Sequence, residues 1–173
     1  MARCACRRAK AAQLANNDVP TFEPAGGADF DPLAHGWVVH EDPGFTTHAG
    51  PIYKRGAGAD RQFALKLLTH HINKNGVAHG GVVCSLMDES LGNYCMGVTG
   101  HDLMVSVQMN LNWVSAGWEH EFLVTTMEIS RVTRSIIFVR GVMRAGDRIV
   151  ATAEGVYKQV RSRPGDQIPG STP

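Results

Sequence analysis

Several features that would mark other protein classes are missing from this sequence. It carries 17 Lys and Arg against 16 Asp and Glu in 173 residues, and a formal net charge of +1 gives no basis for general binding to nucleic acid. No segment approaches the roughly 20 consecutive apolar residues that a membrane-spanning helix needs. We therefore expect neither nucleic acid nor a membrane as a partner.

Cysteines are few and are not spaced for a structural role. Cys4, Cys6, Cys84 and Cys95 form neither the framework of a disulfide-rich secreted protein nor the paired CxxC motifs of a zinc site. Free thiols in a reducing compartment, and hence a cytoplasmic location, are expected. The first residues, MARCACRRAKAAQ, are basic but have no apolar core, which argues against a secretory signal; a disordered tail is favoured over a transit peptide.

Composition and periodicity divide the chain into three parts. Apolar residues make up 43% of the chain and charged residues 19%, which is typical of a globular protein with room for one sizeable core. Residues 1–34 and 161–173 lack sustained periodicity, so we expect a flexible N-terminal extension and a flexible C-terminal tail. Residues 35–160 are the predicted folded domain.

Periodicity within residues 35–160 predicts one helix and six strands. The helix covers residues 81–95, where apolar side chains recur at three- and four-residue steps. Strands are expected at residues 44–55, 61–72, 104–114, 121–130, 135–143 and 148–160. Because short turns join the later strands, these should be antiparallel neighbours. The result is an α+β fold, with one long helix on one face of a curled antiparallel sheet of about six strands.

Strict alternation of apolar and polar residues marks the strand at residues 104–114. One face should carry Val105, Val107, Met109, Leu111 and Trp113, and the other Ser106, Gln108, Asn110 and Asn112. We therefore expect Ser106 on a polar face together with Gln108.

The predicted helix begins at a glycine pair and carries one acid on a narrow face of small residues. At 100° per residue, Asp88 shares its face with Gly81, Cys84, Ser85, Gly92 and Cys95. Gly81 lies near the helix N-terminus, where backbone N–H groups lack intrahelical acceptors and the helix dipole favours negative charge. A free amide there can stabilise an oxyanion formed from a carbonyl, and the Gly80-Gly81 pair leaves room for the substrate to reach it.

Asp88 cannot act at the Gly81 amide of its own helix. Seven residues of α-helix rise about 10 Å, whereas a nucleophile or base must lie roughly 3 Å from the atom on which it acts. Two antiparallel copies of the helix across a two-fold axis would bring each Asp88 to Gly81 of the partner subunit. A catalytic site is therefore expected to be shared across a homodimer.

The segment HGGVVCSLMDESLG, residues 79–92, resembles the hotdog-fold acyl-CoA thioesterases, and in particular their PaaI-like branch, named for the phenylacetic-acid pathway. The resemblance covers about residues 44–160. It implies a long helix wrapped by a curved antiparallel sheet. It also implies hydrolysis of a small or aromatic acyl-CoA to the free acid and coenzyme A, without a metal or redox cofactor.

The resemblance assigns roles to four residues. The Gly81 amide would polarise the thioester carbonyl, and Asp88 would act as nucleophile or general base. Asn73, six residues before His79, would hold the thioester or a water molecule, and Ser106 would assist the acid or water. Gln108 stands where a related pattern has an acid. His79 is expected to bond backbone groups and support the turn rather than to transfer protons.

Coenzyme A is expected along the surface, at residues 114–118 and at the hairpin of residues 131–135. There Arg131 and Arg134, with Ser135 beside them, would suit phosphate oxygens. The resemblance further implies a homodimer as the minimal active unit, and a homotetramer is expected.

Four alternatives compete with this interpretation. The main one is a non-catalytic acyl-CoA sensor or carrier on the same fold; a hotdog hydratase ranks lower because it needs a different acid–histidine arrangement. A metal site at His70, His71 and His79 is rejected, because strand neighbours point to opposite faces and no second carboxylate or cysteine set completes it. Cys84 as a thiol nucleophile lacks an evident base, so packing is favoured.

Overall fold

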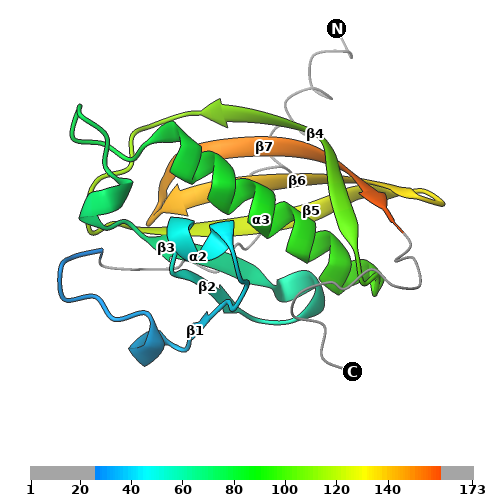
Figure 1. Cartoon of the computed structure of the whole chain (residues 1–173), viewed down its shortest axis with the longest axis horizontal. Coiled ribbons are helices and arrows are strands. Elements are labelled where there is room, and N and C mark those ends of the chain that lie inside the picture. The colour runs from blue at the N-terminus through cyan, green and yellow to red at the C-terminus, as the bar shows by residue number, and fades with distance from the viewer. Residues whose placement is uncertain (1–25, 161–173) are drawn as a thin grey trace, which may run out of the picture.

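The computed structural model describes residues 26–160, shown in colour in Figure 1. Residues 1–25 and 161–173 lie outside the described residues, as do most of the expected N-terminal extension, the C-terminal tail, Cys4 and Cys6. Within residues 26–160, none of the helices has the length and apolar character to cross a membrane. The three-part division and the cytoplasmic location stay predictions.

One antiparallel sheet and one long helix make up the molecule. The helix is α3, Gly80–Thr99, and a second, short helix is α2, Phe45–Ala49. The seven strands follow the spatial order β1-β2-β3-β5-β6-β7-β4. Their bounds are β1 Val38–Val39, β2 Ile52–Arg55, β3 Gln62–Lys66, β4 Met104–Trp113, β5 Phe122–Val132, β6 Ile136–Ala145 and β7 Arg148–Gln159. This confirms the α+β fold, with seven strands against about six expected.

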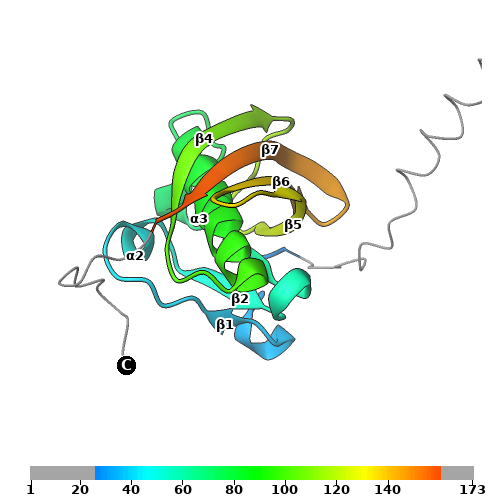
Figure 2. The ribbon, with the colours of Figure 1, turned by 90° about the vertical axis from the view of Figure 1, so that its right-hand side faces the viewer.

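The sheet curls around α3, as the end-on view in Figure 2 shows. The helix turns its apolar side to the sheet and buries Val83, Leu86, Met87, Leu91, Tyr94 and Cys95. These side chains join a core with inward-facing residues of the strands, such as Phe63, Leu65 and Ile137. Fully burying each such aliphatic side chain contributes roughly 1.5–3 kcal/mol, so packing against the sheet holds the helix in place.

A second, smaller apolar cluster covers the other face of the sheet. Trp37 and Phe122 are its large buried members, and Phe30 packs against them. The Lys66 ammonium donates to the backbone carbonyl of Phe30 at 2.7 Å. Part of the expected extension, from residue 26 onward, thus contacts the domain.

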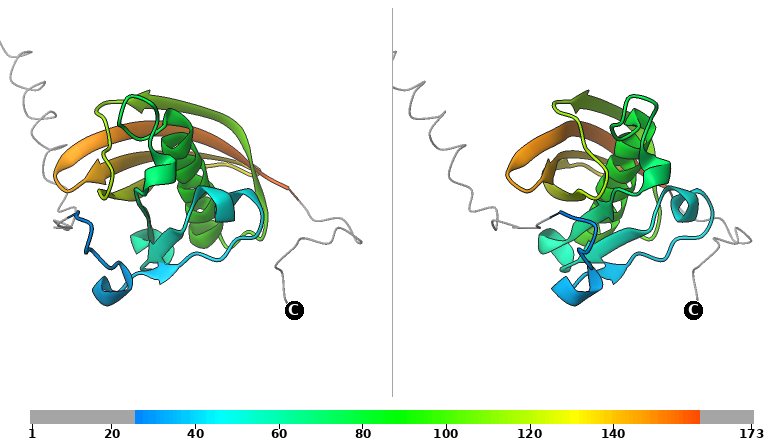
Figure 3. Two further views of the ribbon diagram at one scale, coloured as in Figure 1. Left: turned by 60° about the vertical axis from the view of Figure 1, so that its left-hand side comes forward. Right: turned by 90° about the vertical axis from the view of Figure 1, so that its left-hand side faces the viewer.

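The predicted strand at residues 44–55 was wrong in its first half. Residues 45–49 form α2, and Gly44 before it has a φ of 93°, in the region that favours glycine. Pro51 has no backbone N–H to donate to a strand neighbour, and β2 begins only after it. Figure 3 shows α2 beside α3, where it covers one flank of the long helix.

Two other predicted boundaries also shift. The strand expected at residues 61–72 ends at Lys66, and a 3₁₀ turn, η3, follows at Thr69–His71. The helix expected at residues 81–95 extends to Thr99, where Gly100 ends it with a φ of 70°. Its longer course adds one more turn at the C-terminal end.

Strand β4 contains a β-bulge that the sequence pattern hides. Ser106 pairs with Tyr157 and Gln108 with Val156, so Val107 is an extra residue without a partner in β7. Because side chains alternate between faces, one extra residue reverses the alternation from that point.

The reversal places Ser106 on the face of the helix. After the bulge, Met109 and Leu111 also point inward and pack against the core, whereas Gln108 is exposed on the outer face. The expectation that Ser106 shares a face with Gln108 was therefore wrong.

Candidate active site

Asp88 lies on α3 opposite the inner face of β4 and β7. Its Oδ1 accepts two hydrogen bonds, one from the Ser106 hydroxyl at 2.7 Å and one from the Tyr157 phenol at 2.7 Å. Among the described residues its Oδ2 has no hydrogen-bond partner. The two donors orient the carboxylate and leave one oxygen available for chemistry.

Tyr157 is a site residue that the sequence analysis missed. Burial, together with the nearby Asp88 carboxyl, raises the pKa of its phenol, so the hydroxyl keeps its proton and remains a donor. The signal was present in β7, where alternation places Tyr157 on the inner face. A buried phenol there needs a hydrogen-bond partner.

Two glycines make room for the Tyr157 ring. A Cβ at Gly155, two residues earlier on β7, would lie 2.7 Å from Cε2 of the ring. A Cβ at Gly92, one turn beyond Asp88 on α3, would lie 3.3 Å from Cε1. The aromatic ring therefore fills the space between helix and sheet that the missing side chains leave.

His79 caps the N-terminus of α3. Its backbone is extended, with φ −62° and ψ 133°, and its Nδ1 accepts a hydrogen bond from the Gly81 N–H at 3.0 Å. The Gly81 amide is therefore not free in this structure, in contrast to the expectation. The Gly80 amide, as the first of the helix, has no intrahelical acceptor.

Trp113 at the end of β4 lies against the glycine pair. A Cβ at Gly80 would come within 3.3 Å of the indole Nε1, so only glycine allows this approach without displacement. The indole is 59% exposed. The helix N-terminus and the free edge of the sheet thus meet at one surface.

Asn73 lies in the turn before the helix. Its Oδ1 accepts from the backbone N–H of Asn75 at 2.8 Å, and its own N–H donates to the carbonyl of Val77. These bonds shape the turn that leads to His79. The structure does not bring the Asn73 side chain to Asp88 of the same chain, because Asn73 precedes the helix and Asp88 lies more than two turns inside it.

The residues expected to bind coenzyme A lie at the β5–β6 hairpin. Arg131, Arg134 and Ser135 are all exposed. Figure 1 shows this hairpin at the end of the molecule opposite the start of α3. Within one chain, they are therefore separated from the glycine pair.

Asp88 lies between two cavities of different character. One, of about 340 Å³, is mainly apolar and is lined by Phe45, Ala49, Ile52 and Cys84 together with Met109. The other, of about 460 Å³, carries several carboxylates on its walls. Asp88 lines both cavities, so an apolar group in the first would lie beside its carboxylate.

Cys84 and the histidines add no nucleophile or metal site at this point. Burial and the Asp88 carboxyl raise the pKa of the Cys84 thiol, which disfavours the reactive thiolate. Burial, then the neighbouring His70, lowers the pKa of His71. Within residues 26–160, the group of three metal-ligating side chains that converges is His40, Asp42 and Glu89, and it excludes His70, His71 and His79.

Known proteins with similar sequences support the fold and the family. The sequence profile of the thioesterase superfamily matches residues 75–152, a range that contains Gly81, Asp88 and Ser106. A protein of Pseudomonas aeruginosa, PA0474, which carries a provisional esterase name, is 30% identical over 112 residues. That match covers 62% of this chain and 82% of the relative.

Two solved structures share the architecture. The PaaI protein of E. coli, from the phenylacetic acid degradation operon, superposes with a TM-score of 0.62 at 14% identity, over 66% of this chain and 83% of that chain. A hypothetical thioesterase of Streptococcus pneumoniae, solved with coenzyme A, has a TM-score of 0.62 at 21% identity, over 68% of this chain and 93% of that chain. At these identities they establish the fold. Together with the profile and the relative, they show that the chain belongs to the thioesterase superfamily and is a thioester hydrolase with the hotdog fold.

Proposed function

We propose that this protein hydrolyses a small or aromatic acyl-CoA to the free acid and coenzyme A. The observation that carries the proposal is the Asp88 carboxylate, which lines an apolar cavity, is held by Ser106 and Tyr157 through one oxygen and has the other oxygen free. The fold shared with a thioesterase solved with coenzyme A supports this substrate class.

Asp88 acts on the thioester carbon in one of two ways. As a general base, its free oxygen takes a proton from water while the hydroxide adds to the carbonyl. As a nucleophile, the same oxygen adds directly and forms an anhydride that water then cleaves. In both routes the carbon–sulfur bond breaks, and the departing thiolate takes up a proton to give coenzyme A.

The helix N-terminus supplies the oxyanion donor. The Gly81 amide serves this role only if the carbonyl oxygen replaces the His79 ring as its acceptor. The Gly80 amide needs no such exchange, and together with the helix dipole it favours negative charge at the same place. We therefore include both glycines in the proposed oxyanion site.

A homodimer completes the site. Strand β4 is an edge of the sheet, so one side of its backbone is free to pair with another strand. Exposed apolar side chains accompany that edge, with Val107 at 58% and Trp113 at 59% exposure. Association there brings Asp88 near the glycines of the partner subunit. Asn73 would then orient the thioester or water, and Arg131, Arg134 and Ser135 would contact the nucleotide.

The experiment is hydrolysis of an acyl-CoA panel, followed with a reagent that reports free thiol. Asp88→Asn nearly preserves shape and should lower kcat by about 10²–10⁴-fold, the usual contribution of a general base or more. Glu128→Gln, on an exposed residue paired with Arg140, is the control and should leave the rate unchanged. A folded Asp88→Asn protein with full activity would contradict the proposal.

The sensor alternative predicts a different result on the same samples. A non-catalytic protein would bind acyl-CoA in a calorimeter but release no thiol, and Asp88→Asn would change neither reading. Turnover by the wild-type protein excludes this alternative.

A further inference from the structure

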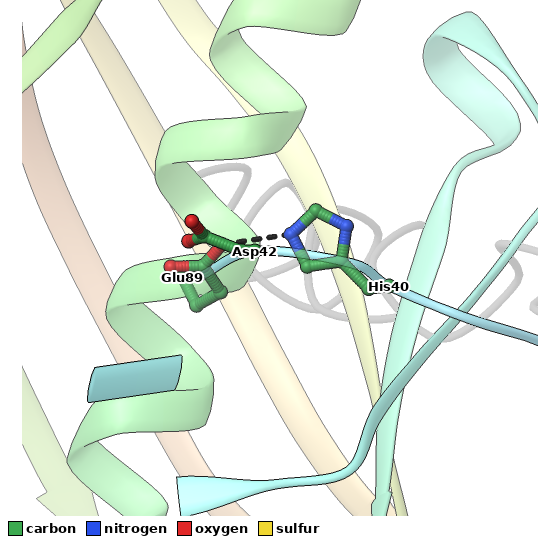
Figure 4. Close-up of side chains that lie close together, drawn as sticks. All are labelled: His40, Asp42 and Glu89. Carbon is green, nitrogen blue, oxygen red and sulfur yellow. Dashed lines mark hydrogen bonds and ion pairs between the residues drawn. The ribbon is translucent and has the colours of Figure 1, made fainter. Parts of the chain in front are cut away.

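A second polar cluster lies close to Asp88 and lines the same cavity, but among the described residues it forms no hydrogen bond with Ser106 or Tyr157. His40 and Asp42 come from the loop between β1 and α2, and Glu89 comes from α3 (Figure 4). Their imidazole nitrogen and carboxylate oxygens all lie within 4.8 Å of one another. One imidazole and two carboxylates from two separate segments thus converge on one point.

The spacing of these atoms suits coordination of one ion. His40 Nε2 and Glu89 Oε1 are 2.9 Å apart. Nitrogen and oxygen ligands lie about 2.1 Å from a zinc-sized ion, so they are about 3.4 Å apart in a tetrahedral site and about 3.0 Å (neighbours) or 4.2 Å (opposite) apart in an octahedral one. The observed spread requires only small side-chain movements to reach these values.

Each ligand side chain is held in place from outside the cluster. The Asn93 amide donates to Glu89 Oε1 at 2.6 Å, and the Thr46 hydroxyl donates to Asp42 at 3.1 Å. The His40 side chain is only 10% exposed and stacks edge-on against Phe63. Supporting contacts of this kind orient metal ligands in proteins.

His40 points its Nε2 atom, the ring nitrogen that has a hydrogen-bond partner, at the two carboxylates. Within the described residues its Nδ1 is buried without a hydrogen-bond partner, so Nε2 makes the ring's only polar contact. Figure 4 shows Nε2 directed at the two carboxylates. Nε2 is therefore the ring nitrogen that could ligate an ion at this point.

The surroundings carry an excess of negative charge. The cavity of about 460 Å³ is lined by Glu41, Asp42, Asp88, Glu89 and Asp102, and among its described lining residues there is no Lys or Arg. Glu89 already pairs with the His40 imidazole, whereas the other carboxylates of this cavity face no Lys or Arg among its described lining residues. A divalent cation would offset the excess of carboxylates, and the cavity gives it a path from solvent.

We propose that His40, Asp42 and Glu89 bind one divalent first-row transition cation, such as Zn²⁺ or Mn²⁺. A mixed set of one imidazole and two carboxylates suits these ions better than Mg²⁺ or Ca²⁺, which prefer oxygen ligands alone. The sequence predicted no metal, because nothing in it links residues 40 and 42 to residue 89. The site is separate from the proposed hydrolysis, since Asp88 is not among its ligands.

Binding is measured on the full chain in a Cys4→Ser/Cys6→Ser background, which removes thiols that would hold zinc elsewhere. The protein is treated with chelator and dialysed, then titrated with ZnCl₂ and, separately, MnCl₂, MgCl₂ and CaCl₂ in a calorimeter. We expect one equivalent of Zn²⁺ or Mn²⁺, with a rise in melting temperature because the ion binds only the folded state.

Three variants test the ligands, and a fourth is the matched control. Asp42→Asn, Glu89→Gln and His40→Gln should each weaken binding by about tenfold or more, whereas Asp102→Asn, which lines the same cavity, should not. Residue 42 lies in a loop, and an asparagine there can still accept the hydrogen bond from the Thr46 hydroxyl. Asp42→Asn should therefore leave the fold intact. The proposal fails if no ion binds stoichiometrically, if binding survives Asp42→Asn and Glu89→Gln, or if only Mg²⁺ or Ca²⁺ binds. Activity is not a readout, so the result is independent of the proposed hydrolysis.

Discussion

The Tyr157 hydroxyl and the Ser106 hydroxyl lie on neighbouring strands and donate to the same oxygen of Asp88, each at 2.7 Å. They are direct partners in the β4–β7 register, so the sheet itself sets their spacing. The carboxylate is thereby fixed from one side only.

Removing one donor should affect turnover more than binding. Tyr157→Phe deletes the buried hydroxyl while its ring still fills the space between Gly92 and Gly155, so we expect kcat to fall by about tenfold with KM little changed. Tyr53→Phe, which removes an equivalent hydroxyl far from Asp88, is the control. Steady-state kinetics on both variants checks the difference, and equal kcat values would remove Tyr157 from the site.

Because both donors share one acceptor, their effects should not add. We expect the Tyr157→Phe/Ser106→Ala double variant to lose a different amount of activation free energy than the sum of the single losses, with a coupling of about 0.5–3 kcal/mol. A double-mutant cycle on kcat/KM measures this coupling. Strict additivity would show that the two hydroxyls act on Asp88 independently.

The cap at the start of α3 should be replaceable by another capping residue. His79→Ala leaves the Gly81 N–H without its acceptor and should cost about 1 kcal/mol of unfolding free energy. His79→Asn supplies an oxygen to the same amide and should retain most of the stability. Urea unfolding of the wild-type protein and the two variants measures the unfolding free energies. An equal loss of unfolding free energy in His79→Ala and His79→Asn would contradict the capping role.

Deletion of the bulged residue in β4 should preserve the inward face of the strand. Ser106 and Gln108 already pair with consecutive residues of β7, so removal of Val107 leaves a regular ladder in which Ser106 and Met109 still face the helix. We therefore expect the deletion variant to fold and to retain turnover. Thermal unfolding and steady-state kinetics measure both properties. A deletion variant that fails to fold would disprove the register.

His71 should make folding stability depend on pH. Burial lowers its pKa in the folded state, so the unfolded chain binds more protons once pH falls below the ordinary histidine value of about 6.5. Stability from this group is therefore fully present above that pH and is lost as pH falls toward the folded pKa. His71→Asn keeps an acceptor for the Leu68 N–H and should flatten this part of the profile. Urea unfolding at pH 7.5 and 5.5 measures the difference.

Sequence patterns predicted the parts of this molecule that repeat over many residues. The apolar stripe of α3, the later strands and the glycine pair before Asp88 are local signals, and each is present. The residues of α2 were assigned to a strand because five residues are too few to show a helical period. The bulge at Val107 was hidden because apolar and polar residues alternate in the sequence straight through it. Only the pairing of β4 with β7 reveals the extra residue.

Contacts between distant segments were beyond local patterns. Tyr157 meets Asp88 only because β7 lies beside β4 and under the helix, and His40 meets Glu89 only through the loop before α2. The sequence correctly placed the Gly81 amide at the start of the helix. The hydrogen bond from this amide to the His79 ring depends on the His79 rotamer, which residue spacing in the sequence cannot reveal.

The glycines on either side of the Tyr157 ring have a consequence for how the acid is aligned. A methyl group at Gly92 or Gly155 would press on the ring edge, at 3.3 Å and 2.7 Å respectively. The ring would then tilt, and the Tyr157 hydroxyl would move away from the Asp88 carboxylate. The hydroxyl is the group through which Tyr157 bonds that carboxylate. The alignment of the reacting acid is thus governed by two residues without side chains, of which Gly155 allows no added Cβ unless the ring moves.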